Sequence, residues 1–106
     1  MGVSLITEPA QPIAGQKTLL FFRLSRAEGL EPYLGALGHM LVASGDLIDM
    51  IHAHPAFPEA LDPEGERQVQ FNLIFPREGV HRVWVQFQND GVVNTAAFNV
   101  LVTRLR

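Results

Sequence analysis

The chain has 106 residues, 47% of them hydrophobic and 18% charged, with a formal net charge of −3. This length and hydrophobicity predict one folded domain over residues 1–106, with its core at about 13–103, rather than a disordered segment. The Lys and Arg residues form no basic stripe, so we expect no nucleic-acid partner. No stretch approaches the roughly 20 apolar residues that span a bilayer, so we expect no membrane insertion.

The sequence contains no cysteine. This excludes disulfides, thiolate nucleophiles, iron–sulfur clusters and zinc sites with cysteine ligands. A blue-copper centre is excluded as well, because it requires a cysteine thiolate. The chain also lacks a Gly-x-Ser-x-Gly elbow and a glycine-rich phosphate loop. We therefore expect a domain that is not an enzyme.

Short stretches of alternating apolar and polar residues predict an all-β chain. The clearest strand is Lys17–Ser25, and Asn89-Asp90-Gly91 predicts a tight hairpin between the last two strands. The segment 26–37 is expected to be a loop with one helical turn around residues 31–34. The other predicted strands are a broken edge strand within 3–16, and 40–44, 47–53, 68–75, 81–88 and 96–103. About seven strands, with turn signals roughly every 8–12 residues, predict an immunoglobulin-like antiparallel β-sandwich.

Residues 40–44 and 47–53 are apolar stretches on either side of Gly45-Asp46. A glycine at the first central position suits a type II′ turn, so the two stretches predict a β-hairpin with a two-residue loop. In that register Ser44 pairs with Leu47, and the pairing of every other residue follows by counting.

Three of the four histidines lie at the open end of this predicted hairpin. The register places His39 opposite His52, and His54 follows two residues later on the same face. Neutral imidazole is a good ligand for copper and zinc, so His39, His52 and His54 are candidate metal ligands. Met50 is expected on the histidine face and could add a thioether, whereas Met40 is expected on the opposite face, in the core.

A second metal-binding pattern competes with the first. His52-x-His54, Glu59 and the later His81 resemble the two histidines, glutamate and third histidine of the cupins, although several spacings differ by a residue. A cupin site would include Glu59 and His81 and leave out His39, whereas the hairpin site would do the reverse. Taken alone, His81 is expected to be a hydrogen-bonding or surface histidine at the start of a strand.

Several motifs together resemble a family of small bacterial immunoglobulin-like domains found outside the cytoplasm. They are Ala14-Gly15-Gln16, Pro32-Tyr33-Leu34-Gly35-Ala36-x-Gly38-His39, His52-x-His54-Pro55, Phe75-Pro76-x-x-Gly79-x-x-x-x-Trp84-x-Gln86-Phe87 and Thr95-Ala96-x-Phe98-x-Val100. Such domains occur in secreted proteins and near modules that handle copper and heavy metals. The resemblance, which spans about residues 13–102, implies a periplasmic or secreted β-sandwich that binds copper through His39, His52 and His54. No signal peptide is visible in the sequence.

Two functions from different classes follow. The first is a non-catalytic metal-binding domain whose partner is a copper ion, with zinc as a possible substitute. The second is an immunoglobulin-like interaction or spacer domain, in which the histidines are structural and a sheet face near Trp84 or an edge strand contacts a protein partner. The cupin-like metal site described above is a third alternative.

Overall fold

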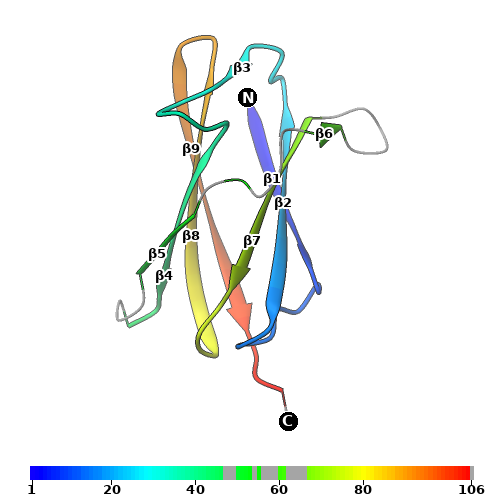
Figure 1. Cartoon of the computed structure of the whole chain (residues 1–106), viewed down its shortest axis with the longest axis vertical. Coiled ribbons are helices and arrows are strands. Elements are labelled where there is room, and N and C mark those ends of the chain that lie inside the picture. The colour runs from blue at the N-terminus through cyan, green and yellow to red at the C-terminus, as the bar shows by residue number, and fades with distance from the viewer. Residues whose placement is uncertain (47–49, 54, 56–59, 62–66, 106) are drawn as a thin grey trace.

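The computed structural model describes residues 1–46, 50–53, 55, 60–61 and 67–105, and at Met50, His52, Ala60 and Leu61 it describes the backbone only. Within these residues two antiparallel sheets face each other (Figure 1). The strands are β1 Gly2–Glu8, β2 Lys17–Ser25, β3 Leu30–Glu31, β4 His39–Ser44, β5 Met50–Ala53, β6 Ala60–Leu61, β7 Arg67–Ile74, β8 Gly79–Asn89 and β9 Val92–Val102. Seven of them have four residues or more, and the fold is the expected immunoglobulin-like sandwich.

One sheet has the strand order β1-β2-β7-β6, and the other has β3-β8-β4-β5 with β9 on the far side of β8. β8 is the centre of the second sheet, because it pairs along its full length with β9 on one side and with β4 and β3 on the other. The position of β8 matters for function, since its outward side chains are flanked by neighbours from two strands.

The core lies between the sheets and is built by alternation along β2, β7 and β8. Every second residue of these strands is buried, as the sequence pattern predicts for a half-buried strand. Phe22 lies at the centre, where its ring contacts the rings of Phe71, Phe87 and Phe98 at centroid distances of 5.5, 6.1 and 5.9 Å. Edge-on contacts of this kind add to the free energy gained by burying the rings.

The predicted strand Lys17–Ser25 is confirmed at both ends, and the hairpin between β8 and β9 has the predicted two-residue loop. Asn89 pairs with Val92, and both loop residues have positive φ, 50° at Asp90 and 79° at Gly91. Two positive φ angles define a type I′ turn, whose twist matches that of the strands it joins. Residues 31–34 form no helical turn; β3 ends at Glu31, and Tyr33 forms a bridge with Ala36.

The predicted register of the β4–β5 hairpin is wrong by two residues. Ala43 pairs with Met50 rather than with Ile48, so the loop is longer than Gly45-Asp46. Asp46 accepts a hydrogen bond from the Ser44 hydroxyl at 2.7 Å and lies 3.8 Å from a guanidinium nitrogen of Arg77. Asp46, at which the predicted two-residue loop would end, is therefore next to Arg77 of the β7–β8 turn.

None of the described segments is a helix, and so none is a helix long and apolar enough to cross a membrane.

Candidate functional site

His39 is the first residue of β4, and the glycine before it allows the strand to lie close to β8. A Cβ atom added at Gly38 would lie 2.6 Å from Cε1 of the buried Phe87 ring and 3.3 Å from the carbonyl oxygen of Gln86. Real Cβ atoms do not approach other atoms so closely, and a buried ring has little freedom to move. Gly38 therefore allows β4 to pack closely against β8, and His39 lies beside this central strand of the sheet.

The imidazole of His39 is oriented by the loop that precedes β4. Its Nε2 lies 2.6 Å from the backbone oxygen of Tyr33, and the Tyr33 ring meets the imidazole edge-on at 5.6 Å between centroids. A carbonyl oxygen can only accept, so Nε2 carries the proton, and in the neutral ring Nδ1 has the lone pair. Metal-binding histidines usually donate their second nitrogen to such a partner, which fixes the tautomer. The donor set at His39 therefore fits a metal ligand that coordinates through Nδ1.

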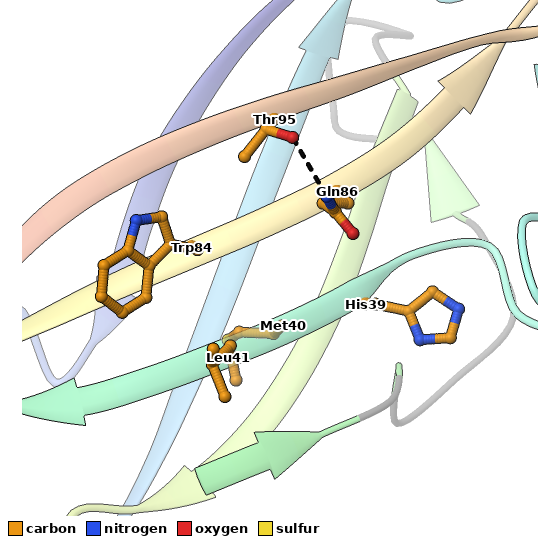
Figure 2. A pocket seen from close by; sticks show the side chains of 6 residues that line it. All are labelled: His39, Met40, Leu41, Trp84, Gln86 and Thr95. Atoms are coloured by element: carbon orange, nitrogen blue, oxygen red, sulfur yellow. Dashed lines mark hydrogen bonds between the residues drawn. The ribbon is translucent and has the colours of Figure 1, made fainter. Parts of the chain in front are cut away.

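His39 lies at one end of a groove of about 460 Å³ on the outward face of the second sheet (Figure 2). The groove is lined by His39, Met40, Leu41, Trp84, Gln86 and Thr95. Figure 2 shows Trp84 at the other end, with Leu41 and Gln86 between it and His39. The Gln86 amide donates a hydrogen bond of 3.2 Å to the Thr95 hydroxyl.

The pairing of β4, β8 and β9 arranges the side chains of this face in rows across the three strands. One row is polar and consists of His39, Gln86 and Thr95, and the next is apolar and consists of Leu41, Trp84 and Ala97. The rows are two residues apart along each strand, or roughly 6.7 Å. The groove therefore has a polar side and an apolar side that lie close to each other.

Only part of the predicted histidine cluster falls within the described residues. The Cα atom of His52 lies opposite that of Leu41 and not, as predicted, opposite that of His39. His54 and Glu59 lie outside the described residues. Among the side chains that the structure describes, no three histidines or carboxylates gather in a metal-binding arrangement.

His81 is on the inner side of β8, whereas His39 is on the outer face of the same sheet. The side chain of His81 is 1% exposed, and its Nδ1 donates a hydrogen bond of 3.1 Å to the Gly79 oxygen. Its ring meets the Phe75 ring edge-on, with 5.0 Å between the centroids. The predicted hydrogen-bonding role is confirmed, while the alternative of a surface position is wrong. Because a half-buried strand alternates its two faces, His81 and His39 cannot share a metal ion across the sheet. This separation argues against a site that joins His81 to the outward face.

The structure describes the side chain of Met40 and the backbone of Met50. Met40 is fully buried in the core, as expected, and reaches the floor of the groove. Met50 pairs with Ala43 through its backbone.

Sequence reasoning placed Trp84 on the outward face with Gln86 but missed two residues that line the groove and the hydrogen-bond partner of His39. Leu41, Thr95 and the carbonyl of Tyr33 come from other segments. The first two could have been found from the register of β4 and β9 against β8, but the third depends on the loop conformation between β3 and β4, which carries no clear sequence signal.

The fold and its outward groove define an immunoglobulin-like β-sandwich whose described residues place the imidazole of His39 and the indole of Trp84 on one sheet face. The chain belongs to the family described as Domain of unknown function (DUF8832), whose model matches residues 2–104. Among curated proteins, no sequence matches the chain significantly.

Two solved structures are similar to this one in fold. CopC from Methylosinus trichosporium OB3b has a TM-score of 0.56 and 12% sequence identity, with 99% of this chain and 97% of that chain covered. A cycloalternan-degrading enzyme from Trueperella pyogenes, solved in complex with a covalent intermediate, has a TM-score of 0.58 and 16% identity. That match covers 89% of this chain but 15% of the enzyme, so the shared fold is a small part of the larger protein. At these identities the similarity shows a CopC-like, immunoglobulin-like fold.

Proposed function

We propose that this domain binds a copper ion through His39, His52 and His54, without catalysing a reaction, and that it works in the periplasm or as a secreted domain. The observation that carries the proposal is the hydrogen bond from Nε2 of His39 to the Tyr33 oxygen, because it gives Nδ1 the lone pair that a metal ligand requires. Copper bound there would be cargo that is stored or passed on.

Three further observations support the proposal. The chain shares the fold of CopC over nearly its whole length. β5, which contains His52, is paired with β4, which begins at His39, and His54 follows His52 by two residues in the sequence. Histidines on paired strands and at alternate positions of one strand can serve one ion. A cysteine-free set of imidazoles suits copper or zinc.

The test is a titration of metal-free protein with Cu(II), with Cu(I) under anaerobic reducing conditions, and with Zn(II). Calorimetry gives the affinity, and the fluorescence of Trp84, the one tryptophan of the chain, gives a second signal from the groove that contains His39. We expect one copper ion per chain, quenching of Trp84, and loss of tight binding in His39→Ala and His54→Ala.

His81→Leu and Glu59→Ala are the matched controls. The first removes the fourth histidine, which lies on the inner face, and the second removes the carboxylate that a cupin site requires. Both variants are expected to bind copper as the parent does. Binding that depends on Glu59 and not on His39 would replace this proposal with the cupin-like site.

The second candidate is an immunoglobulin-like interaction or spacer domain with structural histidines. It is favoured by the match to a small part of a much larger enzyme, where the same fold accompanies other domains. A ligand that binds only the folded state must raise the melting temperature. A melting temperature that excess copper and zinc leave unchanged would therefore favour this candidate over the metal-binding one.

A further inference from the structure

The groove on the outer face of β4, β8 and β9 has a second chemical character, which the metal proposal does not use. Its apolar row presents the half-buried indole of Trp84 beside Leu41, which is 37% exposed. The residue paired with Trp84 on β9 is Ala97, which is small and exposed, so it adds little cover to the indole. A large aromatic side chain is therefore accessible in a concave site, next to a polar row of the same sheet face (Figure 2).

The polar row supplies hydrogen-bonding groups without formal charge. Gln86 uses one amide N–H on Thr95, which leaves the amide its carbonyl oxygen and a second N–H, while the Thr95 hydroxyl still has its own proton to donate. An amide and a hydroxyl thus lie side by side, roughly 6.7 Å from the row of the indole.

The described side chains of the groove favour a neutral ligand. No carboxylate and no Lys or Arg is among the described residues that line it. The nearest guanidinium along β8, that of Arg82, donates to the Asn99 side chain at 2.9 Å, in the row beyond Trp84. Among these described residues an anion would find no Lys or Arg, and an organic cation would find no carboxylate. The complementary ligand is neutral.

A neutral ligand that fits an apolar row beside a polar row must itself have an apolar face and a hydrogen-bonding rim. A pyranose ring has this shape, because its C–H groups form flat apolar faces and its hydroxyls point outward at the edge. An indole is a suitable platform for such a face, and a few well-placed polar groups fix the orientation of a ligand. A proline-rich peptide fits less well, because grooves that bind it are lined by several aromatic rings, whereas Trp84 is the one indole or phenyl ring among the described residues that line this groove.

We propose that this groove binds a neutral hexopyranose unit of an oligosaccharide, with the sugar ring stacked on Trp84 and its hydroxyls hydrogen-bonded to Gln86 and Thr95. The inference goes beyond metal binding and does not depend on it, since the groups that would hold the sugar are those of Trp84, Gln86 and Thr95, none of which is a proposed metal ligand.

The test is an NMR titration of isotope-labelled, metal-free protein, kept in a chelator so that metal binding plays no part. The probes are cellohexaose, maltohexaose and a mannan hexamer, with deca-proline as the competing ligand class. We expect saturable shifts of the Trp84 indole N–H and of the Gln86 and Thr95 amides with at least one of the sugars.

Three variants sharpen the result. Trp84→Ala should weaken sugar binding about tenfold, through loss of the stacking surface. Thr95→Val keeps the shape of the side chain and removes its hydroxyl, so it should weaken binding about fivefold while the fold is retained. Leu101→Ala removes an apolar side chain that is 54% exposed on β9, outside the groove, and should leave binding unchanged.

Absence of saturable shifts with all three sugars would overturn the proposal, as would equal binding by the parent and by both groove variants. Saturable shifts with deca-proline and none with the sugars would overturn the proposal and identify the groove as a peptide-binding site. Failure of this test would leave the copper proposal untouched, because that proposal is decided by calorimetry of the parent protein and of His39→Ala and His54→Ala.

Discussion

Gly38 lies directly against the ring of Phe87, and this contact determines how closely the strand that begins with His39 approaches β8. Gly38→Ala should lower the free energy of unfolding by about 1–3 kcal/mol, because the added methyl group overpacks a closed core. Urea denaturation measures the change.

A double-mutant cycle with Phe87→Leu is the control for this prediction. The smaller, more adaptable leucine should relieve part of the clash, so the two substitutions together should cost less than the sum of their separate effects. Simple additivity would show that Gly38 is required for another reason.

The tautomer of His39 is a second prediction. The Tyr33 carbonyl accepts the proton of Nε2, so the neutral ring should be protonated at Nε2 and not at Nδ1. Long-range nitrogen–proton NMR spectra distinguish the two tautomers, because the nitrogen with a lone pair resonates far from the protonated one. A ring protonated at Nδ1 would contradict both this prediction and the coordination mode proposed for copper.

The aromatic centre of the core gives a third prediction. Phe22→Ala should cost about 3–5 kcal/mol, because it removes a fully buried ring that contacts three other phenylalanines. Ile74→Ala, at a residue of β7 that is 56% exposed, should change the stability by no more than about 0.5 kcal/mol. Chemical denaturation of both variants checks the contrast, and equal losses would mean that the inner and outer faces of the first sheet are assigned wrongly.

The β8–β9 turn gives a fourth prediction. Gly91 has φ of 79°, so Gly91→Ala should cost about 1–2 kcal/mol by forcing a Cβ into the left-handed region. Gly91→Asn should cost less, because asparagine tolerates that conformation. Thermal unfolding of the two variants measures the difference, and an alanine variant as stable as the asparagine one would argue against a type I′ turn.

The strands and their buried faces could be predicted because each is a local pattern. Lys17–Ser25 alternates so regularly that its bounds and its inward residues follow from the sequence alone. The Asp90-Gly91 loop was predictable for a similar reason, since both of its residues accept positive φ.

The register of β4 against β5 could not be predicted in the same way. A shift of two residues leaves every side chain on the same face, so the hydrophobic pattern is equally satisfied in both registers. The remaining signal was the turn preference of Gly45-Asp46, which predicted a loop shorter than the observed one. Asp46 contacts Ser44 and Arg77 at this point of the chain, and the second of these partners is distant in sequence.

The groove was harder to predict than the fold, because its members come from three strands. Trp84 and Gln86 belong to one alternating pattern, but Leu41 and Thr95 join them only through two separate strand pairings. A sequence shows which residues face outward; it does not show which of them become neighbours.

The alternation along β8 has a consequence for how this protein can change over time. Its odd-numbered residues, from His81 to Phe87, fill the interior, and its even-numbered residues, from Arg82 to Gln88, meet the surroundings. Point substitutions on the outward side of the strand can therefore change the surface of the groove without altering the core. Loss or gain of one codon inside β8 would exchange the two sets and place the indole in the interior. In evolution this strand should vary freely in the identity of its even-numbered residues and hardly at all in its length.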